Sequence, residues 1–254
     1  MTVSHMLFNR LLQDLPDGRL VTVQIGLYWT AVVVEVNGET RCGLAATVGD
    51  ESRHYTNEPA IPRAGYLTEF PARGLAEFVH SASLTEVAIG LAAVNALLPR
   101  LTGQWTEIHA EEVIAHHGAG KNVAVVGHFP FVTRLRPRVG NLWVLEQNPR
   151  EGDLPAGSAP EIIPQADVLA ITAMTLLNRT FDGLMSLRRP DTLTLLIGPT
   201  TPLSPVLFDF GVNIISGAVV DDIDATLRGV AQGANFHQLH RLGVRLVSMT
   251  NENR

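Results

Sequence analysis

Cysteine is almost absent from this sequence, since Cys42 is the single thiol among 254 residues. This excludes an intrachain disulfide and a metal cage built from cysteines alone. Clusters of Lys and Arg are also missing, and the net charge is −6. Because affinity for phosphate backbones comes from clustered basic side chains, we expect no nucleic-acid partner. A small molecule or another protein is the favoured partner.

No apolar segment of membrane-spanning length runs without interruption. Residues 192–220 carry only Asp209 as a charge, but Pro199, Pro202 and Pro205 break the stretch in its middle. The N-terminus lacks the basic and apolar regions of a signal peptide. With 46% hydrophobic residues, the composition is that of a core-rich globular protein. We therefore expect a cytoplasmic protein with no membrane partner.

The first 105 residues combine helix and strand patterns. Helices are predicted over 7–15, 72–80 and 84–98. Two β-rich runs, 21–36 and 40–48, flank an Asn-Gly pair, which is the strongest short-range signal of a hairpin. Ser83 and Glu86 have the spacing of a capping box before the third helix. This part is predicted to be a small α+β domain, residues 1–105.

A long loop is predicted between the hairpin and the helices, over residues 50–68. Long loops in compact domains are often functional, so this one could act as a lid over a ligand. An ordinary solvated surface loop is the alternative. Its side chains with binding chemistry are Arg53, His54, Tyr55, Asn57 and Arg63.

From residue 106 onward, short apolar runs alternate with helix patterns. Near-continuous apolar strands between helices are typical of a parallel sheet covered on both faces. We therefore expect an α/β protein whose second part, residues 106–254, is a Rossmann-like, doubly wound domain. The expected strands are 122–127, 142–146, 168–172, 193–198, 212–216 and 244–249, and the expected helices are 106–117, 181–188 and 222–232.

In such sheets, ligands bind beyond the carboxyl ends of the strands, where strand order reverses. The usual order 3-2-1-4-5-6 would place the turns after Val126 and Ile197 side by side. Ligand-binding candidates then follow the strand ends. They are Gly127, His128 and Phe129 after the first strand, Glu146 at the second, Thr172, Thr175 and Asn178 at the third, and Gly198, Thr200 and Thr201 at the fourth.

The Gly-x-Gly-x-x-Gly turn of dinucleotide-binding domains is missing. Glu146 stands nineteen residues after Gly127, where such enzymes keep an acid for the ribose hydroxyls. However, Phe129 and Pro130 would crowd a pyrophosphate, and proline removes a donor. Ordinary NAD binding is therefore not expected. Thr175, Thr201 and similar residues could instead simply cap helices.

Several segments occur in an order that resembles the putative heavy-metal chelation family of microbial proteins. They are Val126-Gly-His-Phe-Pro130, Glu146-Gln-Asn-Pro149, Gly152-Asp153, Pro164-Gln-Ala-Asp167, Thr172-Ala-Met-Thr-Leu-Leu-Asn178 and Gly198-Pro-Thr-Thr-Pro-Leu-Ser-Pro205. The resemblance covers about residues 5–250. It implies an N-terminal domain like that of enolase, a Rossmann-like second domain, and a site in the cleft between them.

Three functions follow as hypotheses. In the first, the cleft binds a divalent or heavy-metal ion or its chelate, with His128 and Glu146 as ligands and either Asp153 or a carboxylate of the N-terminal domain as a third. In the second, an enzyme acts on a small anionic or heteroaromatic metabolite, with His128 as catalytic acid/base and Glu86 orienting the substrate. Asn95 would either reach the substrate in the cleft or bond to a neighbouring loop. The third is a non-catalytic ligand-binding module. A homodimer is the default assembly.

Overall fold

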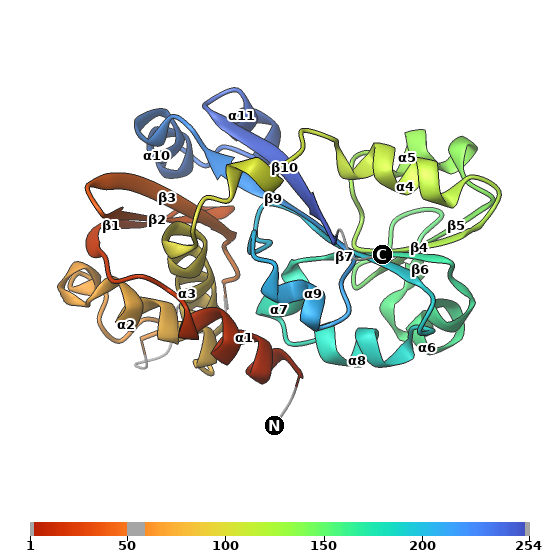
Figure 1. Cartoon of the computed structure of the whole chain (residues 1–254), viewed down its shortest axis with the longest axis horizontal. Helices are drawn as coiled ribbons and strands as arrows, with labels where there is room; N and C mark the ends of the chain where they lie inside the picture. The colour runs from red at the N-terminus through yellow and green to blue at the C-terminus, as the bar shows by residue number, and fades with distance from the viewer. Residues whose placement is uncertain (1–2, 50–58, 252–254) are drawn as a thin grey trace.

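The computed structural model describes residues 3–49 and 59–251. Within these ranges the chain forms a three-stranded sheet and a seven-stranded sheet, placed beside each other (Figure 1). The predicted lid residues 53, 54, 55 and 57 lie outside the described ranges. Arg63 is described, and its guanidinium pairs with Glu69 at 2.8 Å.

The N-terminal part begins with a helix and an antiparallel sheet in the order β1-β2-β3. These elements are α1 (Val3–Gln13), β1 (Arg19–Ile25), β2 (Trp29–Val36) and β3 (Glu39–Ala46). The hairpin predicted at Asn37-Gly38 is confirmed, since both residues have positive φ, 53° and 80°. The run 21–36, expected as one strand, is two. The chain turns at Gly26, where a Cβ would lie 2.2 Å from Val230 O, so only glycine fits.

The buried helix α3 (Leu84–Leu97) packs on one face of this sheet and also contacts α2 (Ala72–Ala76) and the 3-10 turn η3 (Glu77–His80). The capping box expected at the start of α3 is wrong. The Ser83 side chain makes no cap bond; its Oγ donates to Ala60 O at 3.0 Å. Glu86 instead accepts a hydrogen bond from the Ser81 hydroxyl. A further 3-10 turn, η2 (Leu67–Glu69), precedes α2.

The seven-stranded sheet has the order β10-β9-β8-β7-β4-β5-β6. Its neighbouring strands are parallel except β10, which runs antiparallel to β9. The strands are β4 (Asn122–Val126), β5 (Asn141–Glu146), β6 (Leu154–Pro155), β7 (Val168–Thr172), β8 (Leu193–Ile197), β9 (Ile214–Val220) and β10 (Val244–Thr250).

The predicted position of the fourth strand is wrong. The prediction from the sequence did not include β6, which has only two residues. It therefore counted β7 as the third strand of this sheet and β8 as the fourth. Counting β6, the order along the sheet is 3-2-1-4-5-6-7, and β7 rather than β8 pairs with β4. Because β7 lies between them, the turns after Val126 and Ile197 are not neighbours.

Helices cover both faces of this sheet (Figure 1). One face packs against α4 (Ala110–Gly118) and α5 (Val132–Leu135) through a buried cluster that includes Ile114 and Leu135. The opposite face carries α6 (Ala159–Ile162), α7 (Met174–Leu177), α8 (Phe181–Leu187) and α9 (Val206–Asp209). Shorter 3-10 turns connect these elements: η4 (Thr102–Gln104), η5 (Arg136–Arg138), η6 (Ala156–Ser158) and η7 (Ile163–Gln165).

The two sheets meet at β3 and β9, and they share a buried cluster. This cluster joins Ala31, Val33 and Leu44 of the small sheet with residues of β9, β10 and the last two helices, α10 (Ile223–Ala231) and α11 (Phe236–His240). We call it the shared cluster. The small sheet is thus packed between α3 on one side and α10 on the other (Figure 1).

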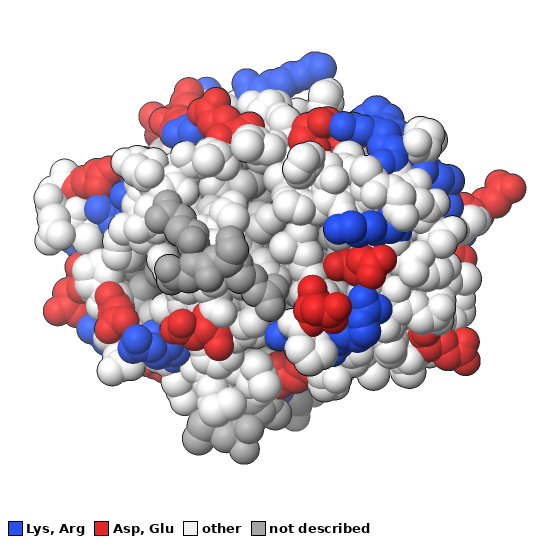
Figure 2. Space-filling view, turned by 45° about the vertical axis from the view of Figure 1, so that its right-hand side comes forward, with Lys and Arg blue, Asp and Glu red and all other residues white. Residues whose placement is uncertain are grey.

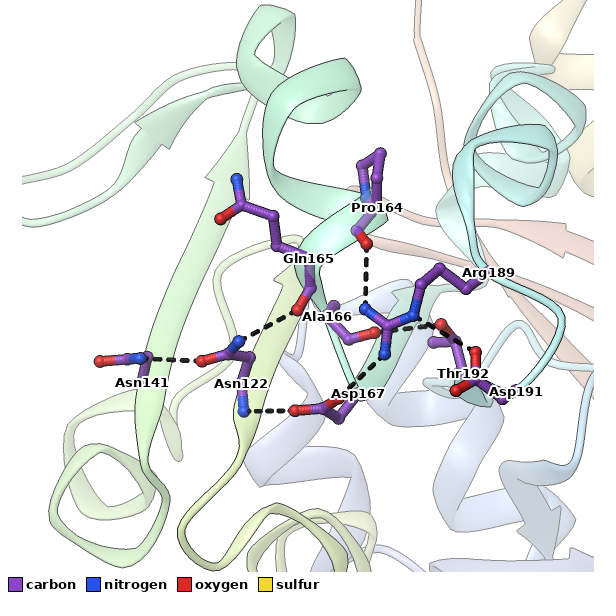
Figure 3. Close-up of polar contacts among 9 residues, drawn as sticks. All are labelled: Asn122, Asn141, Pro164, Gln165, Ala166, Asp167, Arg189, Asp191 and Thr192. Carbon is purple, nitrogen blue, oxygen red and sulfur yellow. Dashed lines mark hydrogen bonds and ion pairs between the residues drawn. The ribbon is translucent and has the colours of Figure 1, made fainter.

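A polar network fixes the amino ends of β4, β7 and β8 (Figure 3). Asn122 N donates to Asp167 Oδ2 at 3.0 Å, and the Arg189 guanidinium pairs with Asp167 at 2.9 Å and donates to Pro164 O at 3.0 Å. The backbone donor of Asn122, together with Arg189, lowers the pKa of the Asp167 carboxyl against the opposing effect of burial. These bonds tie the amino ends of the three strands to one another and to the segments that precede them.

The outer surface carries both signs of charge. On the face shown in Figure 2, acidic and basic side chains are interspersed in small groups rather than gathered by sign. Ion pairs among the described residues include Arg134 with Glu111 and Arg138 with Glu112, both at 2.6 Å. In the described ranges, no helix combines the length and apolar character needed to cross a bilayer.

Candidate functional site

A pocket of about 320 Å³ opens at the carboxyl ends of β4, β5 and β7. The chain leaves β4 toward β5 on one side and returns to β7 on the other, so strand order reverses here. Open parallel sheets bind ligands at this position, and the volume suits a small molecule. We call it the switch-point pocket. Seven candidate residues line it: Gly127, His128, Phe129, Glu146, Thr172, Thr175 and Asn178.

Gly127 allows the chain to turn sharply out of β4. Its φ is 99°, and a Cβ at this position would lie 3.1 Å from Thr172 Cγ2. Both the positive φ and the close approach favour glycine. Gly127 N also donates to Leu145 O at 2.9 Å. The ends of three adjacent strands are thereby held together at the base of the pocket.

His128 is paired with the carboxylate of Asp153. The two Asp153 oxygens lie 3.0 and 2.8 Å from His128 Nδ1, and the Asp153 side chain is only 1% exposed. Burial raises the pKa of Asp153, but hydrogen bonds from Arg150 N and the His128 ring outweigh it and lower this pKa below its ordinary value. Since an ionised carboxylate can only accept, Nδ1 carries the proton.

The geometry leaves Nε2 as the reactive nitrogen of His128. Among the described residues, the ring makes its hydrogen bonds through Nδ1, and Nε2 has no partner. With Nδ1 protonated, Nε2 keeps its lone pair and can bind a metal or accept a proton. A carboxylate behind an imidazole fixes the ring's orientation in both kinds of site.

Glu146 holds the loops at the edge of the pocket. Its Oε2 accepts from His128 N at 2.9 Å, and its Oε1 accepts from Gln147 N at 2.7 Å and Asn148 N at 3.4 Å. Both oxygens are therefore engaged by backbone amides. Its observed contacts position the His128 loop.

The third side of the pocket is polar and comes from β7 and the segment after it. Thr175 Oγ1 donates to Thr172 O at 2.7 Å, so this hydroxyl serves the turn. Asn178 Oδ1 accepts from both N and Oγ1 of Thr180, at 3.2 and 2.7 Å. These two bonds fix the orientation of the Asn178 amide group: Oδ1 faces Thr180, and Nδ2 lies on the other side. Within the described part of the chain, Nδ2 donates no hydrogen bond, which leaves it available to a ligand.

The other candidates lie away from this pocket, where the two halves of the chain meet. Asn95 Nδ2 donates to Leu44 O at 2.9 Å and to Thr200 O at 3.1 Å, while Thr200 Oγ1 accepts from Ala46 N at 2.9 Å. Thr201 is buried beside Asn95. Gly198 follows β8, and Glu86 contacts Ser81. Gly198, Thr200 and Thr201 follow β8, and β7 lies between that strand and β4, which His128 follows. None of these five candidates lines the switch-point pocket.

A metal site made only of protein ligands is not visible. Within residues 3–49 and 59–251, no group of three or more His, Cys, Asp or Glu side chains is placed to hold an ion. Cys42 is buried, and burial raises the pKa of its thiol to about 12. The thiolate form that binds metals is therefore disfavoured at neutral pH.

Several pocket residues were not foreseen from the sequence. Leu145 and Met174 add apolar surface, and Gln147, Ala156 and Thr180 complete the lining. Leu145 and Gln147 flank Glu146, so a wider window around the predicted strand end would have included them. Ala156 follows β6, which has no periodic signal of its own.

Comparison with known proteins places the chain in a family. A family model described as "Putative heavy-metal chelation" matches residues 110–249, and a second model with the same description matches residues 8–98. An uncharacterised protein of Methanocaldococcus jannaschii is 26% identical over 232 residues, which cover 89% of this chain and 88% of that protein.

Two solved structures have the same fold. Both are proteins of unknown function from the family of the first model. The Desulfitobacterium hafniense protein matches with a TM-score of 0.83 at 27% identity, covering 97% of this chain and 98% of its own. The Pyrococcus horikoshii protein matches with a TM-score of 0.81 at 22% identity, covering 98% and 99%. The chain therefore belongs to the "Putative heavy-metal chelation" family.

Proposed function

We propose that the switch-point pocket binds a small metal chelate, with His128 Nε2 as a protein ligand to the metal. The observation that carries this proposal is the pair formed by His128 and the buried Asp153, 2.8 Å apart. Imidazole suits zinc, copper, iron and nickel. A carboxylate behind the ring strengthens such a ligand and holds its tautomer.

The ligand inventory favours a chelate over a bare ion. His128 is one nitrogen donor, Glu146 is engaged by three backbone amides, and the described residues form no three-ligand group. A metal that brings its own chelator needs only one or two donors from the protein. The pocket's polar side, with Asn178 Nδ2 as a donor, suits the carboxylate or carbonyl oxygens of a chelator.

Copper(II)–iminodiacetate is a suitable probe, because its chelator leaves a coordination position for imidazole. We expect wild-type protein to bind it with one nitrogen-coordinated equivalent, seen by electron paramagnetic resonance and calorimetry. His128→Gln should lose that equivalent. Asp153→Asn should weaken binding by about 10- to 100-fold, as loss of a residue behind a metal ligand does.

His237→Gln is the matched control, since His237 is an exposed helical histidine distant from the pocket in sequence. It should bind the probe as the wild type does. Equal binding by the His128→Gln variant would overturn the proposal, because the remaining signal would come from surface histidines.

Acid–base catalysis on a small anionic or heteroaromatic metabolite is the second candidate, and the same residue pair favours it. A carboxylate that orients an imidazole also stabilises the imidazolium formed when Nε2 takes a proton. Incubation with a defined mixture of carboxylic acids and purines, followed by mass spectrometry, tests this. An enzyme would consume a component in a reaction that the His128→Gln variant does not perform.

A further inference from the structure

A second cavity, of about 30 Å³, lies where the two sheets meet. It shares no lining residue with the switch-point pocket. Its walls come from β3, α3, the connection that follows α3, the loop before α9, and β9. They include Cys42, Asn95, Trp105, Thr201 and Val219.

Three buried polar atoms on these walls have no hydrogen-bond partner among the described residues. They are Asn95 Oδ1, Trp105 Nε1 and Thr201 Oγ1. Thr201 is only 2% exposed. Buried polar groups in folded proteins are nearly always paired with protein or ordered water. Three unpaired atoms from three separate segments on one small cavity therefore indicate a bound ligand.

The hydrogen-bonding capacity of these atoms defines the ligand. Trp105 Nε1 can only donate. Asn95 Oδ1 can only accept, and the side chain cannot flip without losing the bonds from Nδ2 to Leu44 O and Thr200 O. The Thr201 hydroxyl can do either. An anion without a proton has nothing to donate to Asn95, and a cation cannot accept from Trp105. Water does both, and the volume holds roughly one or two molecules.

We infer that this cavity is a hydration site at which ordered water bonds to Asn95, Trp105 and Thr201. The site joins α3 to the loop between β8 and α9, next to the direct bonds by which Asn95 and Thr200 link α3, β3 and this loop. Water is thus a structural component of the junction between the two halves of the chain. This inference is independent of the metal-chelate proposal.

Thr201→Val tests the site by the sign of its effect, because valine has nearly the shape of threonine. If water bonds to the hydroxyl, valine removes that bond and Tm falls. If the cavity is dry, valine replaces an unpaired buried hydroxyl and Tm stays constant or rises. Thr192→Val is the matched control, since its buried hydroxyl donates to Ala166 O at 3.0 Å. Its Tm must fall.

A high-resolution crystal structure of the full wild-type chain provides a readout that needs no variant. We expect a water peak within hydrogen-bonding distance of Asn95 Oδ1, Trp105 Nε1 and Thr201 Oγ1. An empty cavity, or a peak that contacts only one of these atoms, would overturn the inference, as would an unchanged or higher Tm for Thr201→Val.

Discussion

Single residues in the switch-point pocket are held by backbone amides as much as by other side chains. Glu146 accepts from three amides, and Asp153 accepts from Arg150 N as well as from His128. Such carboxylates fix loop geometry before any ligand arrives, and preorganised donors lower the cost of binding. Substitutions here should therefore change both stability and binding.

Gly127→Ala should lower stability by about 1–3 kcal/mol, the cost of holding a non-glycine residue in strained backbone geometry, and should weaken binding of the copper–iminodiacetate probe. Its Cβ would press against Thr172 Cγ2. Gly198→Ala is the matched control, since Gly198 has a φ of 116° but no neighbouring atom within 4 Å of the place that an alanine Cβ would take. Denaturant unfolding should show the larger loss for Gly127→Ala. Equal losses would mean that the contact with Thr172 is unimportant.

Asp153→Asn should reduce stability by about 2 kcal/mol at neutral pH, because charge-assisted hydrogen bonds to a buried carboxylate are lost. The folded-state pKa of Asp153 lies below its ordinary value of 3.8. Its contribution is therefore fully present above that value and disappears as pH falls through the lowered folded-state pKa. Unfolding measured as a function of pH should show a constant difference in stability between the two proteins above pH 3.8 and a shrinking difference below it. A difference that grows below pH 3.8 would contradict this assignment.

Among the helices and strands, those with a strong periodic pattern of apolar residues were the ones predicted from the sequence. Apolar periodicity located α1, α3 and the long parallel strands. It could not locate β6, which has two residues and includes Pro155. That single omission moved β8 next to β4 in the predicted order. Residues at the ends of β4, β5 and β7 still line one pocket, because strand ends alone place them. The predicted position of the residues after β8 depended on the predicted strand order. Because that order was wrong, these residues do not lie next to the turn after β4.

Asp222 provides a test at this scale. Asp222 caps the helix after β9, because its carboxylate accepts from Ala225 N at 2.9 Å at the start of α10. Asp222→Ala should cost about 1 kcal/mol, a typical loss for an N-cap. Asp224→Ala, in the first turn but not at the cap position, should cost less. Thermal unfolding of both variants measures the difference, and equal Tm values would argue against the cap.

On the scale of the whole molecule, the two ends of the parallel strands differ in their contacts. The network of Asp167 and Arg189 links the amino ends of β4, β7 and β8 (Figure 3). The carboxyl ends of β4, β5 and β7 line the switch-point pocket. The first arrangement contributes to folding, while the second leaves His128 Nε2 and Asn178 Nδ2 available. Stability and ligand binding should therefore be separable by mutation.

Arg189→Ala should lower stability only slightly and should leave the affinity for the copper–iminodiacetate probe unchanged. The expected loss is modest because the Arg189 side chain is 37% exposed and water screens its ion pairs. Denaturant unfolding and calorimetry on the same sample provide both readouts. Weakened binding in a variant that remains folded would show that the two ends of the sheet are coupled.

The shared cluster has a consequence for how this chain can be divided. It places Ala31, Val33 and Leu44 against Val220, Val230 and Val244, so residues from both family-model regions bury one another. A fragment ending near residue 105, or one beginning there, would expose to solvent the apolar side chains that the shared cluster buries in the whole chain. Each fragment should be prone to self-association when produced alone. The two should remain in solution when produced together, because each supplies the covering that the other needs.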